Sequence, residues 1–187
     1  MKKIEDYIFV ENIIPKNICE ELINECNKRD WKKHTWNSYA EGTNLSEPTK
    51  ELDSMPCTQE QQDKITPYLL KVLEKYQIKV CVPGEKTQSF LTKLSPIKFN
   101  KYEVGTMMRE HYDHIHSLFD GKMKGVPIVS IVANLNEDYE GAEFYCRGKE
   151  IKLKTGDILL FPSNFMYPHE VKETIKGTRY SFVSWSF

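Results

Sequence analysis

The sequence predicts a mainly β fold with flanking helices, in which a jelly-roll core occupies the second half of the chain. The first observation is a single change of pattern near residue 90. Before this point apolar residues recur at helical spacing, whereas after it short runs of β-forming residues alternate with turn residues. The second observation is the number of those runs. Eight short antiparallel strands after a helical start are typical of a jelly roll backed by helices.

The first predicted helix follows Pro15, a residue that suits the first turn of a helix because its fixed φ is already helical. Apolar side chains then recur at helical spacing at Ile18, Leu22, Ile23 and Cys26.

A second helix is expected over residues 59–76. One face would carry Ile65, Leu69, Val72, Leu73 and Tyr76. Pro67 falls inside this run, so the helix is expected to begin or bend there, because proline lacks the backbone N–H that a helix interior needs.

The segment 34–56 is polar and longer than an ordinary connection, which indicates an irregular excursion. Because it carries Trp36 and Tyr39, we interpret it as a lid or wall that contacts substrate through these two aromatic residues. The alternative is that both side chains anchor the segment to the core.

The eight strands are placed from runs of β-forming residues between glycine, proline and asparagine. They are expected near residues 93–102, 108–113, 127–135, 142–146, 150–153, 157–161, 169–171 and 179–187. The 187 residues suit one domain. We expect residues 1–90 to supply helical support and substrate-side loops, and residues 91–187 to form the core.

Composition limits the partners. Lysine and arginine total 26 against 27 acidic residues, so a net charge of −1 gives no general attraction to nucleic acid or anionic membrane. No stretch approaches the roughly twenty apolar residues of a membrane helix. Five scattered cysteines without a CxxC pair argue against a disulfide framework and a thiolate zinc site. We expect a cytoplasmic protein with no nucleic-acid or membrane partner.

A metal site is indicated by the placement of the histidines. His111 and Asp113 share one face of a predicted strand, because alternate side chains of a strand point the same way. His169 can complete the set if its strand lies beside theirs. Two imidazoles and one carboxylate form the facial triad of non-haem iron(II) oxygenases. HxD alone is a weak motif, however, and a zinc site of His111, His114 and His169 is an alternative.

A candidate anion site lies on the last predicted strand, ten residues after His169. Arg179 and Ser181 share one face with Val183 and Trp185. An inward guanidinium needs a partner, and a dicarboxylate offers parallel hydrogen bonds to it, with the Ser181 hydroxyl adding another. A protein acid such as Glu143 or Glu170 is the alternative partner.

The second half of the chain resembles the prolyl-4-hydroxylase-like branch of the 2-oxoglutarate/iron(II)-dependent dioxygenase superfamily. The matching pieces stand in order: Tyr102-Glu103-Val104-Gly105, His111-Tyr112-Asp113, Asn134-Leu135-Asn136, Glu140-Gly141-Ala142-Glu143-Phe144, Gly156-Asp157-Ile158-Leu159-Leu160-Phe161-Pro162, Pro168-His169-Glu170-Val171 and Thr178-Arg179-Tyr180-Ser181. The resemblance implies a double-stranded β-helix core with Fe(II) bound by His111, Asp113 and His169. It implies that Arg179 binds the distal carboxylate of 2-oxoglutarate and that Tyr102 contacts this co-substrate. Asn134 departs from the oxygen-sensing members, which have a second tyrosine at this position.

The resemblance also implies the reaction. With Fe(II), 2-oxoglutarate and O₂, and with ascorbate as an optional reductant, such enzymes hydroxylate an aliphatic C–H bond and release succinate and CO₂. Asp113 favours hydroxylation, since halogenating relatives lack the carboxylate. A prolyl residue in a peptide or protein is the expected substrate. The alternatives are another side chain or a small molecule, or a non-catalytic metal-binding jelly roll. The sequence does not indicate the oligomeric state.

Overall fold

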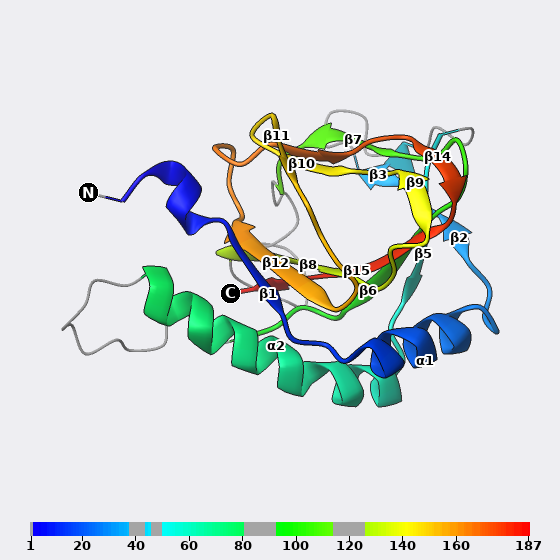
Figure 1. The fold of residues 1–187 in the computed structure, drawn as a ribbon, viewed down its shortest axis with the longest axis horizontal. Helices are drawn as coiled ribbons and strands as arrows, with labels where there is room; N and C mark the ends of the chain where they lie inside the picture. The colour runs from blue at the N-terminus through cyan, green and yellow to red at the C-terminus, as the bar shows by residue number, and fades with distance from the viewer. Residues whose placement is uncertain (1, 38–43, 46–49, 81–92, 114–125) are drawn as a thin grey trace.

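The computed structural model describes residues 2–37, 44–45, 50–80, 93–113 and 126–187 (Figure 1). Two helices lie against one face of a seven-stranded sheet, and a smaller four-stranded sheet faces its other side (Figure 1). The predicted mainly β architecture with flanking helices is therefore confirmed.

The described helices are the 3₁₀-helix η1 (Ile4–Tyr7) and the α-helices α1 (Lys16–Cys26) and α2 (Gln59–Val80). Pro15 precedes α1 as its N-cap residue instead of standing in the first turn. Among the described residues, neither α-helix combines the length and apolar character that a membrane span requires.

Helix α2 begins well before Pro67 and continues through it. Its start is fixed by a reciprocal cap. The backbone N–H of Gln61 donates to the Thr58 hydroxyl oxygen at 3.2 Å. The backbone N–H of Thr58 donates to the side-chain oxygen of Gln61 at 3.1 Å. The expectation that the helix begins at Pro67 is wrong, because the Thr58–Gln61 cap starts the helix more than two turns before this proline.

All eight predicted strands are present, and further strands join them. The seven-stranded sheet has the order β1 (Phe9–Asn12), β12 (Asp157–Pro162), β8 (Val129–Asn134), β15 (Arg179–Ser186), β6 (Lys98–Tyr102), β5 (Asp53–Pro56) and β2 (Lys32–Lys33). The four-stranded sheet has the order β11 (Lys149–Ile151), β10 (Phe144–Cys146), β13 (His169–Val171) and β7 (Met108–His111). Two small ribbons pair β9 (Tyr139–Gly141) with β14 (Thr174–Gly177), and β3 (Trp36–Asn37) with β4 (Asn44–Leu45).

The segment 34–56 is more regular than expected. It contains β3 and β4, and β5 at its end extends the main sheet by pairing with β6. The strand β5 was missed because a proline ends its four residues and an acidic residue begins them, a composition that does not favour a strand. Pairing with β6 outweighs this weak local preference.

Side-chain alternation divides the interior into two cores. In β12, Ile158 and Leu160 pack with the helices, whereas Leu159 and Phe161 pack between the two sheets. All four are fully buried, and each contributes roughly 1.5–3 kcal/mol of burial free energy. The same alternation in β6 sends Phe99 toward the helices and Tyr102 toward the space between the sheets.

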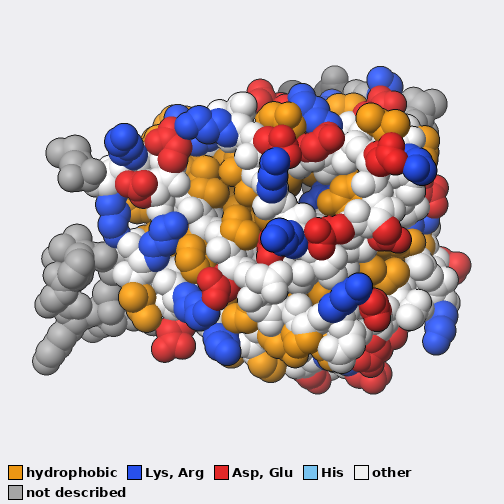
Figure 2. Space-filling view, in the orientation of Figure 1, with side chains coloured by type: hydrophobic (Ala, Val, Ile, Leu, Met, Phe, Trp, Pro, Cys, Tyr) orange, Lys and Arg blue, Asp and Glu red, His pale blue; other side chains and the backbone are white. Residues whose placement is uncertain are grey.

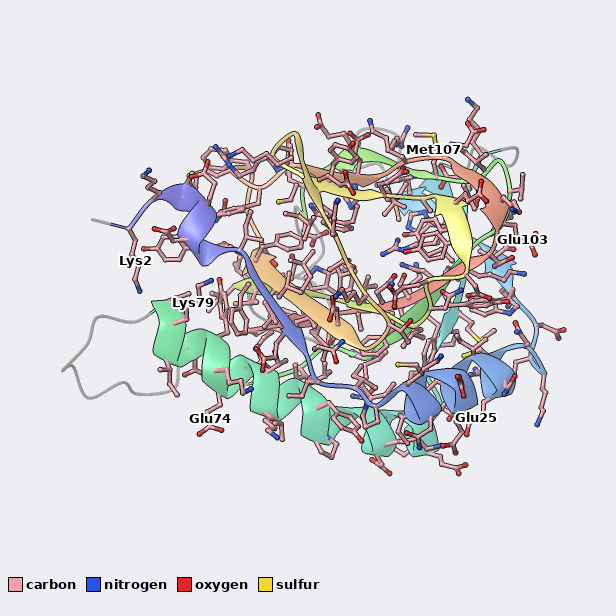
Figure 3. The ribbon with its side chains drawn as sticks, in the orientation of Figure 1. Lys2, Glu25, Glu74, Lys79, Glu103 and Met107 are labelled. Carbon is pink, nitrogen blue, oxygen red and sulfur yellow. The ribbon has the colours of Figure 1, made fainter. Side chains whose placement is uncertain are left out.

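Polar contacts join the N-terminal segment and the helices at the surface. Glu25 of α1 pairs with Lys64 of α2 at 2.8 Å, and Lys2 donates to the backbone carbonyl of Lys79 (Figure 3). Exposed ion pairs of this kind contribute little each. Basic and acidic side chains are intermixed on the face shown in Figure 2, in keeping with the net charge of −1.

Candidate metal centre

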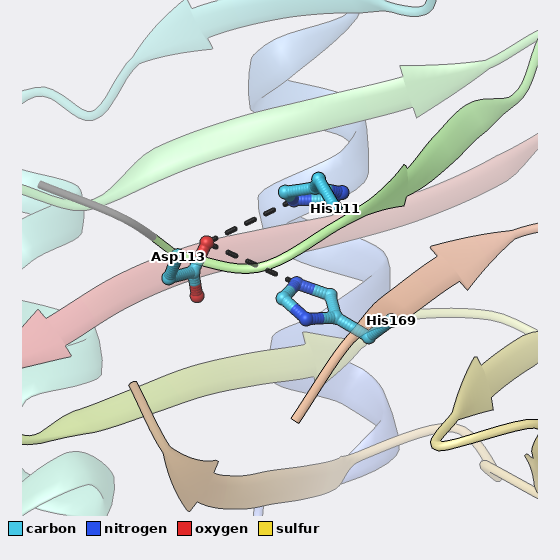
Figure 4. Close-up of side chains that lie close together, drawn as sticks. All are labelled: His111, Asp113 and His169. Atoms are coloured by element: carbon cyan, nitrogen blue, oxygen red, sulfur yellow. Dashed lines mark ion pairs between the residues drawn. The ribbon is translucent and has the colours of Figure 1, made fainter. Parts of the chain in front are cut away.

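His111 and His169 stand directly opposite each other on neighbouring strands. β7 and β13 pair antiparallel, and these two residues are partners in the register. The Nε2 atoms of His111 and His169 each lie 3.8 Å from Oδ1 of Asp113 (Figure 4). One nitrogen or oxygen from each residue falls within 4.8 Å of the others. These separations exceed hydrogen-bond length and leave room for an ion among the three atoms.

Backbone carbonyls orient both imidazoles. Nδ1 of His111 lies 2.9 Å from the Arg109 carbonyl oxygen, and Nδ1 of His169 lies 3.1 Å from that of Tyr167. Because a carbonyl only accepts, each Nδ1 carries the proton and each Nε2 presents a lone pair toward Asp113. The His169 ring also stacks on that of Phe144 and meets that of Phe161 edge-on.

A pair of hydroxyls orients the carboxylate. Ser130 of β8 donates to Oδ2 of Asp113, and its oxygen lies 2.6 Å from that of Ser163. This leaves Oδ1 facing the two imidazoles. Burial, followed by the proximity of His169, lowers the pKa of His111. A neutral imidazole is the form that binds a metal ion.

The three side chains open onto a cavity of about 630 Å³ between the two sheets. The wall contributed by the large sheet includes Lys98, Asn100, Tyr102, Val183 and Trp185. The opposite wall includes Phe144 and Val171, and His34 and Trp36 line one side. A volume of this size accommodates a small dicarboxylate together with part of a second molecule.

Arg179 lies on β15 in register with Tyr102 of β6 and is 1% exposed. Its Nε donates to Oδ1 of Asn134 at 3.0 Å, but Nη1 and Nη2 have no hydrogen-bond partner within the described part of the chain. The buried Ser181 hydroxyl is equally unsatisfied there. Neither Glu143 nor Glu170, the alternative partners considered from sequence, forms an ion pair with Arg179. Glu170 instead pairs with Lys172 at 2.7 Å.

The guanidinium carbon of Arg179 lies 5.2 Å from the centre of the Tyr102 ring. Burial raises the pKa of the Tyr102 phenol, while Arg179, Asn100 and Ser181 act in the opposite direction. Tyr102 lines the large cavity, whereas Arg179 borders a smaller one of about 160 Å³, and Phe144 lines both. The three predicted co-substrate residues thus form one buried polar cluster beside the candidate metal centre. Its unsatisfied donors fit the carboxylate of an anion.

Trp36 lies beside the metal centre and is also anchored. Its ring meets that of His111 edge-on at 5.2 Å, and its Nε1 donates to the buried Glu51 carboxylate at 2.7 Å. The Arg109 guanidinium covers the indole at 4.3 Å. Trp36 therefore lines the cavity and is anchored by Glu51, and its contact with substrate stays a prediction.

Two residues singled out in the sequence, Tyr39 and His114, lie outside the described residues. The zinc alternative that includes His114 therefore also lies outside the described residues.

Sequence reasoning missed Lys98, Asn100 and Ser130. The strand period of two, counted back from Tyr102, places Asn100 and Lys98 on the same face. Along β8, the same period of two places Ser130 on the same face as Asn134. The signal was thus available in the alternation of each strand.

The comparisons with known proteins agree with this geometry. A model of the 2OG-Fe(II) oxygenase superfamily matches residues 97–187. A PKHD-type hydroxylase of Aliarcobacter butzleri is 28% identical over 184 residues, covering 92% of this chain and 76% of that protein. A PKHD-type hydroxylase of Delftia acidovorans is 27% identical over 101 residues, covering 50% of this chain and 44% of its own length. The match therefore spans less than half of the Delftia protein.

Two solved structures share the fold. A prolyl hydroxylase from Trichoplax adhaerens, in complex with a peptide of the hypoxia inducible factor oxygen degradation domain, has a TM-score of 0.70 at 16% identity. This similarity covers 97% of this chain and 84% of that one. A prolyl-4-hydroxylase from Pseudomonas putida has a TM-score of 0.66 at 19% identity and covers 96% and 91%. The predicted jelly-roll core is thereby confirmed.

Proposed function

We propose that this chain, which belongs to the 2OG-Fe(II) oxygenase superfamily, is an iron(II)- and 2-oxoglutarate-dependent dioxygenase that hydroxylates an aliphatic C–H bond. Succinate and CO₂ are the expected co-products. One observation carries the proposal. A His-Asp-His set and a buried, unsatisfied arginine-serine pair lie on facing sheets around neighbouring cavities.

His111, Asp113 and His169 would hold the iron. Two imidazole nitrogens and one carboxylate oxygen suit Fe(II) and leave coordination positions for a chelating keto acid and O₂. When bound, the iron supplies the oxidation chemistry together with these two co-substrates. The carbonyls of Arg109 and Tyr167 and the hydroxyl of Ser130 keep the donor atoms turned inward before the metal arrives.

Arg179 would bind the distal carboxylate of 2-oxoglutarate through Nη1 and Nη2, with Ser181 donating a further hydrogen bond. Asn134 leaves both of these nitrogens available because it occupies Nε. The Tyr102 hydroxyl is held in its neutral form by burial and is therefore a donor as well. Apolar walls at Val132, Phe144 and Val183 limit water around the reacting groups.

The proposed primary substrate is a prolyl residue of a peptide or protein. Support comes from the two solved proteins that share the fold, since both are prolyl hydroxylases. The cavity adds support because its walls include the flat face of Trp185 beside Val183, surfaces suited to a pyrrolidine ring.

The test is an assay of the recombinant chain with Fe(II), ascorbate, O₂ and 2-oxoglutarate. We expect succinate to form slowly without substrate and faster with a proline-containing peptide that gains 16 Da. Gain of 16 Da on another side chain or on a small molecule would replace the prolyl assignment. Absence of succinate with every addition would contradict the oxygenase and favour a non-catalytic metal-binding protein.

A further inference from the structure

Lys98 is a cation of the large cavity that the proposed reaction does not use. It begins β6 and shares the cavity-facing side of that strand with Asn100 and Tyr102. Strand β6 pairs with β15, and in that pairing Lys98 lies opposite Val183. The cavity wall that leads to Arg179 at one end therefore has a second basic residue at its other end.

The ammonium of Lys98 has no counter-charge within the described ranges: no ion pair or hydrogen bond connects it to another residue there. Lys101, on the opposite face of the same strand, pairs with Glu103 at 2.8 Å and with Asp53 at 3.4 Å. Burial lowers the pKa of Lys98. A charge held in this way is costly unless an anion joins it.

Neither Glu51 nor Asp113 neutralises Lys98, because both carboxylates face other groups. The exposed Glu110, which also lines the cavity, acts on Lys172. Both carboxylate oxygens of Glu51 face other partners, namely Trp36 at 2.7 Å and His34 at 3.4 Å. Asp113 faces the two imidazoles and Ser130. Lys98 acts on His34 as a positive neighbour. The positive charge of Lys98 is therefore not neutralised by these acids.

The co-substrate is not the expected partner of Lys98. Lys98 and Tyr102 are four positions apart on β6, a Cα spacing of about 13 Å. The end carbons of a five-carbon dicarboxylate are only about 5 Å apart. With one carboxylate at Arg179 and the keto-acid end at the triad, both charges of 2-oxoglutarate are already matched.

We propose that Lys98 binds a carboxylate of the primary substrate, so that the enzyme selects substrates with an anionic group near the carbon to be hydroxylated. This inference rests on the proposed function. The carboxylate can be the α-carboxylate of a free amino acid or the side chain of an acidic residue beside the target residue in a peptide. The ammonium would form a charge-assisted hydrogen bond with either one.

Binding of matched acid and amide probes tests the proposal. The full chain is held anaerobically with Fe(II) and 2-oxoglutarate, and binding is followed by tryptophan fluorescence, because Trp36 and Trp185 line the cavity. The probes are L-proline against L-prolinamide, and N-acetyl-prolyl-aspartate amide against its asparagine counterpart. The first pair reports an α-carboxylate and the second an acidic neighbour.

We expect the acid of one pair to bind roughly 10- to 100-fold more tightly than its amide, the range for a hydrogen bond to a charged group. Lys98→Met should remove this preference, and Lys98→Arg should restore most of it. Lys98→Gln is a second neutral variant if the methionine form does not fold. Lys101→Met is the control from the other face of β6 and should keep the preference.

Equal binding of acid and amide in the wild-type protein, including no binding of either, would overturn the proposal. Survival of the preference in Lys98→Met would do the same. A rise of tenfold or more in the Kd of 2-oxoglutarate in Lys98→Met, with the probe preference unchanged, would reassign Lys98 to the co-substrate. Failure of the proposed function is read separately, as absence of succinate from the wild-type protein under O₂.

Discussion

Replacement of Arg179 by methionine separates binding from folding more sharply than any other change in this protein. The substitution keeps much of the side-chain volume and removes the charge. In the ligand-free protein the guanidinium is 1% exposed, and its Nη1 and Nη2 have no partner among the described residues. A buried donor without a partner destabilises a protein by about 1–3 kcal/mol. Arg179→Met should therefore leave the ligand-free melting temperature unchanged or raise it.

The same substitution should strongly weaken binding of 2-oxoglutarate. Truncation of one partner of a buried charged pair costs about 2–5 kcal/mol, which corresponds to roughly a thirtyfold to several-thousandfold rise in Kd. The assay is calorimetric titration with 2-oxoglutarate, together with melting curves with and without it. The wild-type protein should gain thermal stability from 2-oxoglutarate, and Arg179→Met should not.

Arg147→Met is the matched control. Arg147 lies on the turn between β10 and β11, where it donates to the Met166 carbonyl and covers the Tyr167 ring. Its replacement should leave 2-oxoglutarate affinity unchanged. Unchanged affinity in a folded Arg179→Met protein would refute the assignment. A large loss of stability in the ligand-free variant would show instead that the arginine serves the fold.

The remaining predictions concern the metal and the cavity wall. His111→Ala and His169→Ala should abolish iron binding, measured by metal analysis, and turnover, measured by succinate formation. His114→Ala should keep both iron binding and turnover. Loss of iron in His114→Ala would mean that the ligands are wrongly assigned. Ser130→Ala should reduce iron affinity by roughly 10- to 100-fold while the fold melts normally, and unchanged affinity would show that its bond to Asp113 is incidental. Trp36→Phe should impair substrate-coupled turnover more than uncoupled consumption of 2-oxoglutarate; a fall in melting temperature with normal coupling would favour the anchoring role alone.

The metal centre could be predicted from sequence because strand geometry relates its parts simply. A period of two places His111 and Asp113 on one side, and adjacency of one more strand brings His169 opposite. Asp113 nevertheless lies beyond the end of β7, and Ser130 fixes its direction. That bond joins residues that are 17 positions apart in the sequence, so no local pattern could indicate it.

The first half of the chain was harder to predict because tertiary contacts decide its strands. β1 carries Glu11 and Asn12 within its four residues, yet it pairs with β12 along its whole length. Such a strand has little preference of its own and forms because β12 offers it an edge. The long α2 helix was predictable, but its start depended on the Thr58–Gln61 cap and not on Pro67.

Lys98 illustrates a different limit. A lysine on a strand is ordinarily assigned to solvent, since burial of its charge is unfavourable. Only the structure places it on the cavity side of β6, opposite Val183. A polar residue that faces inward on a strand thus indicates a functional site. Arg179 gave the same indication in the sequence.

The most direct test of the account is calorimetric titration of the wild-type protein with 2-oxoglutarate, anaerobically, with and without Fe(II). In the proposed complex, one carboxylate of 2-oxoglutarate binds Arg179 and the keto-acid end binds at His111, Asp113 and His169. We therefore expect binding of one molecule per chain, with an affinity that rises at least tenfold when the iron is present. Binding that is equally tight without metal, or absent with it, would contradict the central claim that one site holds both.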